Sequence, residues 1–304
     1  MNKEKEKVKS YSTSTQRRYF LISMLAPAIL MLAFFTIYPF VVNLKNSFFH
    51  YNLTEPYNRY FVGGNNYFRL IQDKLFWQSF LRTLYFVSGA VSIEFLLGLG
   101  IAYLLKDDFR GRNFFRIAFI LPMGATPIAI SFVWKIMLNP SLGIINYLLR
   151  ILGLQGLDWV GNPRSVIPSL ILIDVWCWTP FMMLILLAGF LSLPKEPFEA
   201  AEIEGASTLQ SFFYIALPLL KPLILVALLF RIIDAFRTFD IIFVITAGGP
   251  GHYSETLNIL TYLQGFKFLH ISYASTLAIA MLIILIVICM FITRLRAIRE
   301  IWSV

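Results

Sequence analysis

The sequence predicts an all-α integral membrane protein with six transmembrane helices. Hydrophobic residues make up 58% of the 304 residues and charged residues only 14%, with a mean hydropathy of +0.71. Soluble domains carry about 25% charged residues. Six apolar runs are each near or above the ~20 residues that cross a hydrocarbon core. These runs lie at about 19–42, 80–105, 114–138, 166–193, 219–245 and 271–293.

The distribution of Lys and Arg predicts which side of the membrane each connection faces. If residues 1–18 lie inside, the inside segments hold fourteen Lys and Arg residues and the outside segments hold seven. Because cytoplasmic loops carry the excess of Lys and Arg, both termini and the connection between the fourth and fifth runs are predicted to be cytoplasmic. The predicted organisation is a flexible tail at 1–18, a six-helix domain at 19–293 and a second tail at 294–304.

Two longer connections and the third apolar run carry further structure. The polar segment 43–79 predicts a loop with a short amphipathic helix near Tyr67 to Trp77. Pro122 and Pro127 predict kinks in the third run. In the loop 139–165, the apolar stretch from Ile144 to Leu154 is expected to lie along the membrane surface.

Composition argues against several classes of function. The net charge of +9 does not indicate a nucleic-acid partner, because the basic residues gather at the ends of apolar runs and in the tails. Cys177 and Cys289 each lie in an apolar run, and none of the three histidines has metal-ligand spacing. The phosphate-binding pattern G-x-x-x-x-G-K-[ST] is absent. We therefore expect no metal, cofactor or catalytic site in this chain.

The segment Glu199 to Pro222 is a polar island between two apolar runs. Its first part, to Glu204, is rich in Ala and Glu and predicts a short helix. Gly205 is suited to a turn with positive φ, and Ser207 or Thr208 to capping the helix that follows. Pro218 and Pro222 are expected where a further helix begins.

The spacing of this island resembles the EAA signature of ABC importer permeases. Glu199-Ala200-Ala201 is followed by three residues and Gly205, and nine residues later by Ile215-Ala216-Leu217-Pro218. The resemblance implies that 194–218 is a cytoplasmic helix-turn-helix that docks on an ATPase subunit and transmits its motion. The resemblance assigns this coupling role to Glu199, Ala200, Ala201, Glu202, Gly205, Ile215, Leu217 and Pro218. An amphipathic pair of surface helices without a partner remains the alternative.

Other segments resemble the carbohydrate-type branch of the same family. They are Phe61 to Tyr67 (FVGGNNY), Trp176 to Leu193, Arg231 to Asp240 (RIIDAFRTFD) and Thr246 to Pro250 (TAGGP). Glu204 stands where the general pattern often has Asp, a conservative departure. The resemblance implies the type I ABC importer permease fold and import of a disaccharide or oligosaccharide, such as a trehalose- or maltose-type sugar, by alternating access.

The resemblance also implies an assembly in the cytoplasmic membrane of a bacterium or archaeon. Its other members are a second, different permease, two ATPase subunits that bind ATP and Mg²⁺, and an extracytoplasmic solute-binding protein. Two alternatives belong to other classes. An ion-gradient-driven secondary transporter or channel would use the charges within the membrane as ion sites, whereas a membrane-embedded enzyme would need a nucleophile and base, and the spans contain no such set.

Charged residues inside the predicted spans are the candidates for function within the membrane, because each costs at least ~2.5 kcal/mol to insert. They are Glu94, Asp174, Arg231, Asp234, Arg237 and Asp240. The last four recur every third residue and alternate in sign, so one interpretation is structural pairing of Arg231 with Asp234 and of Arg237 with Asp240. The other is a lining for a hydrated sugar path.

Sugar sites combine an aromatic side chain that stacks on the ring with polar groups that bind hydroxyls. Trp176, Trp178 and Thr179 adjoin Asp174 and provide this mixture. The candidate path residues are Asp174, Trp176, Trp178, Thr179, Arg231, Asp234, Phe236, Arg237 and Asn258, with Glu94 and Asp240 as candidate structural charges. Because most aromatic residues in such a chain face lipid or the interface, the membrane belt is the alternative location for either tryptophan.

Overall fold

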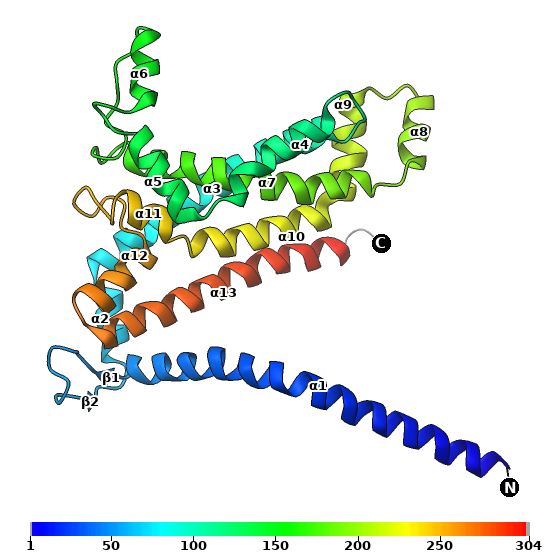
Figure 1. Cartoon of the computed structure of the whole chain (residues 1–304), viewed down its shortest axis with the longest axis horizontal. Helices are drawn as coiled ribbons and strands as arrows, with labels where there is room; N and C mark the ends of the chain where they lie inside the picture. Colours follow the sequence, from blue (N-terminus) through cyan, green and yellow to red (C-terminus); the bar gives the residue numbers. More distant parts are fainter. Residues whose placement is uncertain (1, 302–304) are drawn as a thin grey trace.

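The computed structural model describes the backbone of residues 2–301 and the side chains of residues 17–294. Within residues 2–301, five helices are long and apolar enough to cross a membrane, and a bent pair of helices raises the number to six. The six predicted spans are therefore present (Figure 1). The candidate spans are Arg17–Ser47, Lys74–Leu105, Val166–Leu191, Thr208–Ile245 and Ile271–Arg294, together with the bent pair Arg112–Gly124 and Pro127–Met137.

The first helix extends further than its apolar run. Helix α1 (Asn2–Ser47) includes residues 2–18, the segment that the sequence predicts as a flexible tail. The alternating Lys and Glu residues in that segment are good helix formers. Its location on the cytoplasmic side stays a prediction. At the other end of α1 follow the paired strands β1 (Phe49–His50) and β2 (Tyr60–Phe61), which are antiparallel.

The amphipathic helix expected near Tyr67 to Trp77 is present but shorter. It is α2 (Asn65–Gln72), and the second span, α3 (Lys74–Leu105), begins six residues earlier than the predicted Phe80. The boundary lies at Asp73, because its backbone is extended and its carboxylate accepts a hydrogen bond from the Leu75 amide at 2.8 Å. This N-cap fixes the start of α3.

The third span is broken rather than kinked. Helix α4 (Arg112–Ile120) continues into the turn η1 (Leu121–Gly124), and α5 (Pro127–Met137) follows at an angle of 96°. The residue before a proline avoids helical backbone angles, and Thr126 accordingly has ψ of 139°. The loop that follows contains α6 (Ile144–Ile151).

The predicted coupling segment lies between α7 (Val166–Leu191) and α10 (Leu217–Phe236). It contains α8 (Glu196–Ile203), α9 (Thr208–Ser211) and a π-helical turn, η2 (Phe212–Ala216). A helix begins near Pro218 as expected, because α10 starts at Leu217 with Pro218 in its first turn, whereas Pro222 lies inside α10. Helix α10 follows α9 and η2 without a break. The π-turn accommodates the proline, with the Leu217 amide donating to Phe212 five residues earlier.

The fifth span, Thr208–Ile245, is interrupted within its apolar run. Helix α10 stops at Phe236, and after three residues α11 (Asp240–Ile245) begins. Helix α12 (Leu257–Tyr262) and the π-turn η3 (Leu263–Lys267) then lead to the last span, α13 (Ile271–Ile301). Residues 302–304 of the predicted C-terminal tail lie outside the described residues.

Helices α3, α7 and α10 form the packed centre of the molecule. Close approach of α3 and α7 depends on Gly98, where an added Cβ would lie 2.7 Å from the Cβ of Met182. Small residues allow membrane helices to approach in this way. A second cluster of buried residues, including Leu105, Met183 and Leu220, joins the same three helices next to the coupling segment.

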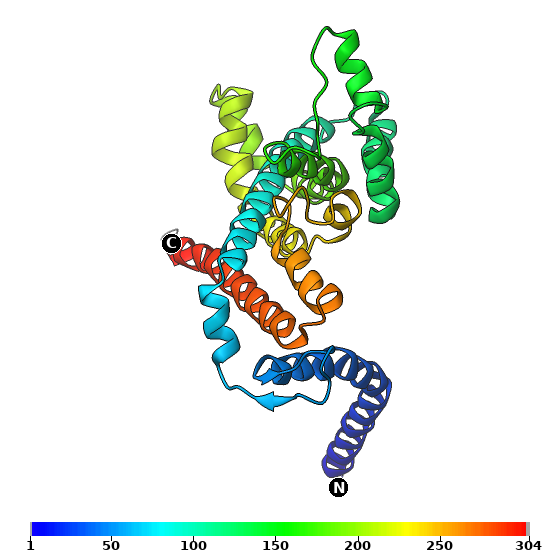
Figure 2. The same ribbon diagram turned by 90° about the vertical axis from the view of Figure 1, so that its left-hand side faces the viewer.

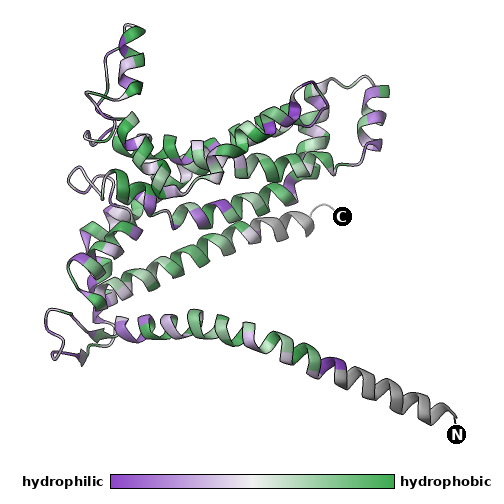
Figure 3. Ribbon diagram, viewed as in Figure 1, coloured by the Kyte–Doolittle hydropathy of each residue, from purple (hydrophilic) through white to green (hydrophobic). Residues whose placement is uncertain are grey.

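The two ends of the bundle differ in what they present. Helix α8 lies at the same end as the start of α1 and the last described turns of α13, and α2, α6, α11 and the β1–β2 hairpin lie at the other end (Figures 1 and 2). Figure 3 shows that hydrophobic residues dominate the long helices and that hydrophilic residues are frequent in α8 and in the connections. The start of α1, the last described turns of α13 and the coupling segment therefore share one end of the bundle, and their location on the cytoplasmic side stays a prediction.

Candidate functional site: a buried charge cluster and a projecting helical turn

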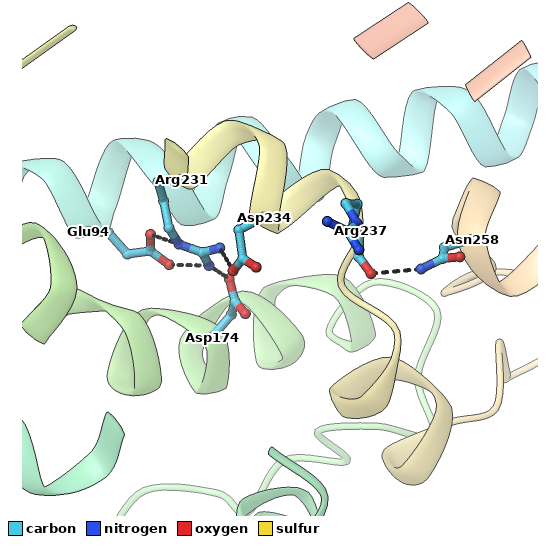
Figure 4. Close-up of polar contacts among 6 residues, drawn as sticks. All are labelled: Glu94, Asp174, Arg231, Asp234, Arg237 and Asn258. Carbon is cyan, nitrogen blue, oxygen red and sulfur yellow. Dashed lines mark hydrogen bonds and ion pairs between the residues drawn. The ribbon is translucent and has the colours of Figure 1, made fainter. Parts of the chain in front are cut away.

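Arg231 of α10 lies at the centre of a cluster of charged side chains that joins three spans (Figure 4). Its Nε donates to Glu94 Oε2 of α3 at 2.5 Å, and its Nη2 donates to Glu94 Oε1 at 2.9 Å. Nη2 also donates to Asp174 Oδ2 of α7, and Nη1 donates to Asp234 Oδ2 at 2.9 Å. The guanidinium therefore contacts carboxylates from α3 and α7 as well as from its own helix.

Because the cluster is buried, each of its charges must be paired. The side chains of Arg231, Glu94 and Asp174 are fully buried, whereas that of Asp234 is 52% exposed. The guanidinium carbon also lies 5.2 Å from the centre of the Trp178 ring, within range of a cation–π contact. Removing one member of a buried ion pair costs about 3–5 kcal/mol, because it leaves an uncompensated charge. The cluster therefore fixes the register of α3, α7 and α10 against one another.

The second predicted pair is wrong. Arg231 and Asp234 do pair, but Arg237 and Asp240 form no ion pair among the described residues. The prediction assumed one continuous helix, whereas α10 ends at Phe236 and Asp240 begins α11. The Arg237 side chain is exposed, and its backbone carbonyl accepts a hydrogen bond from Asn258 Nδ2 at 2.7 Å. This hydrogen bond connects the break in the fifth span to α12 (Figure 4).

The remaining candidate path residues separate into two groups. Trp178 faces the charge cluster, but Trp176 points elsewhere and packs its ring against Trp134 of α5, with 5.7 Å between ring centres. Phe236 and Thr179 are buried in the protein. Two buried oxygens, Asp174 Oδ1 and Thr179 Oγ1, have no hydrogen-bond partner among the described residues. The structure brings Asp174, Trp178, Arg231 and Asp234 together with Glu94, and leaves Trp176 and Phe236 outside this cluster.

This arrangement can hold the helices in place and bind polar groups, but it is not suited to catalysing a reaction. Within the described residues, no group of three or more His, Cys, Asp and Glu side chains is placed to hold a metal ion. The exposed carboxylate of Asp234 can accept hydrogen bonds from a polar solute, and the exposed guanidinium of Arg237 can donate them.

The predicted coupling segment is a helix-turn-helix that projects from the bundle. None of the residues of α8 is buried, including Glu199, Ala200, Ala201 and Glu202. Gly205 has φ of +82°, the left-handed region that the sequence anticipates, and no atom lies within 4 Å of an added Cβ. Ile215 lies in the π-turn, and Leu217 and Pro218 begin α10. All eight predicted coupling residues therefore belong to one exposed structure or to its base.

A capping box begins the helix that follows the turn. The Gln210 amide donates to Ser207 Oγ at 3.3 Å, and the Ser207 amide donates to Gln210 Oε1 at 2.7 Å. Two amide donors that the helix itself leaves free are thereby satisfied. Ser207 rather than Thr208 is the cap, so the sequence narrowed the choice to the right pair of neighbours.

Sequence reasoning missed the apolar residues that this segment exposes. Ile203 is 88% exposed, and Leu209 and Tyr214 are exposed as well. Behind α8 lies an open cavity of about 430 Å³ whose lining includes Tyr103, Phe198 and Phe212. Large apolar side chains in an otherwise polar segment were the signal available in the sequence. They give the projecting turn a surface suited to burial against another protein.

Comparison with known proteins agrees with this architecture. Residues 94–300 match the family model described as binding-protein-dependent transport system inner membrane component. The trehalose/maltose transport system permease protein MalF of Thermococcus litoralis is 39% identical over 239 residues, which cover 79% of this chain and 81% of that protein. The sulfoquinovosyl glycerol transport system permease protein SmoG of Agrobacterium fabrum is 34% identical over 285 residues, covering 93% and 91% of the two chains.

A solved structure extends the likeness to the fold. It is a bacterial ABC transporter involved in the import of the acidic polysaccharide alginate. Its matching chain aligns with a TM-score of 0.82 at 21% identity, covering 93% of this chain and 96% of that one. The resemblance seen in the spacing from Glu199 to Pro218 is thus confirmed at the level of fold and family. This chain belongs to the family of binding-protein-dependent transport system inner membrane components, the permease subunits of ABC transporters.

Proposed function

We propose that this chain is the membrane-spanning permease subunit of an ATP-driven importer that moves a carbohydrate by alternating access. The observation that carries the proposal is the exposed helix-turn-helix of α8 and α9, which projects from the end of the bundle where α1 begins. A helix with no buried residue and with Ile203 exposed is suited to dock in another subunit. We propose that this other subunit is an ATPase. Since the sequence of this chain has no phosphate-binding loop, the ATPase would bind ATP and Mg²⁺.

The substrate class rests on the relatives. Those named for trehalose/maltose and for trehalose are 39% and 34% identical and are matched over about four fifths of their length. A disaccharide or oligosaccharide of this kind is the substrate we propose. The partners we propose are a second, different permease, two ATPase subunits and an extracytoplasmic solute-binding protein. A related transporter of known structure was solved with its periplasmic binding protein, and the family itself is described as binding-protein-dependent.

The connections of α8 suggest how motion reaches the spans. On one side α8 follows α7 after a short link, and on the other side the Gly205 turn leads into the continuous helix of α9, η2 and α10. Arg231 ties α10 to Glu94 of α3 and to Asp174 of α7. A displacement of α8 by an ATPase would therefore act on three spans that are held together as one unit. Alternating access requires such rigid-body movement of packed helices.

Under this proposal Asp234, Arg237 and Asn258 line the path, and Glu94, Asp174 and Arg231 hold its wall. Asp234 and Arg237 are the exposed charges near the cluster, whereas the other three charges are fully buried. A hydrated path needs polar groups that solvent can reach. Asn258 lies beside Arg237 and can contribute its amide oxygen, because the hydrogen bond to the Arg237 carbonyl uses only its Nδ2.

The test is Gly205→Val in the chain assembled with its partner subunits in proteoliposomes. Valine resists positive φ, whereas asparagine tolerates it, so Gly205→Asn is the matched control. We expect Gly205→Val to retain the assembled complex and ATP hydrolysis but to lose most uptake of the sugar, and Gly205→Asn to retain both. Full uptake by Gly205→Val would contradict the coupling role of this turn.

A second experiment addresses the ion-gradient alternative. The chain is reconstituted alone and together with its ATPase partner, with and without ATP, and uptake is measured under an imposed proton or sodium gradient. Uptake that needs both the ATPase and ATP supports the proposal. Gradient-driven uptake by the chain alone would replace it with a secondary transporter.

A further inference from the structure

Helix α6 lies across the direction of the spans. Figures 1 and 2 both show α6 from the side, close to vertical, whereas α7, α10 and α13 run roughly horizontally along the bundle in Figure 1. It lies at the end of the bundle opposite α8 and extends sideways beyond the neighbouring helices. A helix in this position runs parallel to the membrane plane at the level where the spans end.

One face of α6 is fixed to the chain on either side of it. The buried Asn146 donates through Nδ2 to the carbonyls of Pro140 at 3.0 Å and Leu157 at 2.8 Å. Its Oδ1 accepts hydrogen bonds from the Leu157 amide at 3.1 Å and from Trp159 Nε1 at 2.8 Å. Arg150 Nη2 also donates to the Pro140 carbonyl at 3.0 Å. Both the oxygen and the nitrogen of the Asn146 side-chain amide are therefore bonded to the flanking loop.

The other face of α6 is apolar and has nothing packed on it among the described residues. Ile144, Tyr147, Leu148 and Ile151 have the i, i+3, i+4, i+7 spacing of one helical face, and all four are exposed. Leu152 and Leu154 extend this apolar face beyond the helix. Figure 1 shows the chain that returns from α6 on the side of the helix away from α8, and Asn146 is bonded to that chain at Leu157, opposite the apolar face. The apolar face is thereby turned toward the level of the spans.

We propose that α6 is an interfacial helix whose apolar face is seated in the lipid headgroup and acyl boundary of the extracytoplasmic leaflet. Two observations select lipid as the occupant. Helix α5, which precedes the α6 loop and belongs to a membrane span, also exposes the apolar residues Phe132, Val133 and Ile136. The face also carries Tyr147, an amphipathic aromatic of the kind enriched at membrane interfaces. A helix of this type lies in the interface plane with its apolar side down.

This seating would anchor the connection between α5 and α7. Lys135 of α5 donates through Nζ to the Val244 carbonyl of α11 at 2.8 Å, so α5 is also tied to the segment beyond the break in the fifth span. Helix α7, which follows the loop, carries Asp174 and Trp178 of the charge cluster. Lipid contact at α6 would therefore hold the extracytoplasmic end of the spans at a fixed depth.

The test measures the depth of single positions in the full chain in phospholipid nanodiscs. An environment-sensitive fluorophore is attached to Leu148→Cys, Ile151→Cys or, as a matched control, Gln155→Cys, an exposed polar position in the returning chain. Cys177 and Cys289 are replaced by alanine. If that background is not stable, Cys177 is retained, because its thiol is buried away from the labelling reagent. Quenching is recorded with a lipid that carries a headgroup nitroxide and with aqueous iodide.

We expect the headgroup nitroxide to quench labels at 148 and 151 at least about threefold more strongly than the label at 155, and iodide to show the reverse order. Iodide quenching at 148 and 151 equal to that at 155 would overturn the proposal. So would protection of 148 and 151 from both quenchers, which would indicate that protein covers this face. The measurement is repeated with the partner permease present, and loss of lipid contact there would also overturn it.

Discussion

Arg231 and Glu94 form a two-point ion pair across the interface of α10 and α3, with distances of 2.5 Å and 2.9 Å between their paired atoms. The pair joins residues 137 positions apart in the sequence and is fully buried. Asp174 adds a contact from α7 to the same guanidinium. The geometry makes Arg231 the residue on which the relative placement of three spans depends.

Replacing Arg231 by methionine should destabilise the chain by about 3–5 kcal/mol, because Glu94 and Asp174 would be left buried without a cation. The measurement is the temperature at which half the detergent-solubilised chain ceases to elute as a single species. Arg237→Met is the control, since Arg237 is exposed and makes no ion pair in the described residues. Equal stability of the two variants would show that the cluster does not fix the helices.

Replacing Gly98 by valine should separate α3 from α7. An added Cβ there would lie 2.7 Å from Met182 Cβ and 3.0 Å from the Met183 backbone nitrogen, which cannot move aside as a flexible side chain can. Gly100→Val is a matched control, because nothing lies within 4 Å of its Cβ position and both residues are helical. We expect a lower melting temperature for Gly98→Val alone, measured by the same elution assay. Similar values would mean that helix propensity rather than the close approach governs the effect.

Replacing Ile203 by aspartate should weaken binding of the ATPase subunit without altering the fold of the chain. The side chain is 88% exposed in the free chain, so the substitution disturbs no internal contact. Loss of an apolar anchor at an interface costs about 1–2 kcal/mol or more, which is at least about fivefold in Kd. Affinity is measured between the purified ATPase and the chain in nanodiscs. Tyr57→Asp, at an exposed residue at the other end of the bundle, should bind normally.

Replacing Asp234 by asparagine should slow sugar uptake while leaving the complex assembled. The side chain is half exposed, and Arg231 keeps its bonds to Glu94 and Asp174. Uptake and melting temperature are compared with those of Asp174→Leu, which places an apolar group against the guanidinium and should lower stability. Normal uptake by Asp234→Asn would remove this residue from the proposed path.

Most of the fold follows from local properties of the sequence, and the exceptions lie where the helices bend. The apolar runs gave the six spans because length and composition alone decide whether a segment crosses a bilayer. They did not reveal the 96° bend between α4 and α5, because a proline can kink a helix or end it according to its neighbours. The start of α3 at Lys74 was likewise hidden, since its N-cap Asp73 lies in a polar stretch.

The sequence predicted which charged residues belong to the site but not which of them form ion pairs. Local spacing suggested Arg237 with Asp240, because it took the fifth span as one helix, and the end of α10 at Phe236 separates them. The partners of Arg231 on α3 and α7 are set by tertiary packing, which spacing along one helix does not report. The positive φ of Gly205 and a cap at Ser207 or Thr208 were foreseen, because both features depend on the residue and its immediate neighbours.

The π-turn from Phe212 to Ala216 also affects how many residues the segment between Gly205 and Pro218 needs. A π-turn is an α-helix that has accepted one additional residue, so the helix on either side keeps its direction and its facing. Deleting a single residue there should return the turn to regular α-helix and leave Arg231 opposite Glu94, as an unchanged melting temperature of the deletion variant would report. The interval between Gly205 and Pro218 is thus longer by one residue than helical geometry requires. That surplus residue can be lost without turning the fifth span about its axis.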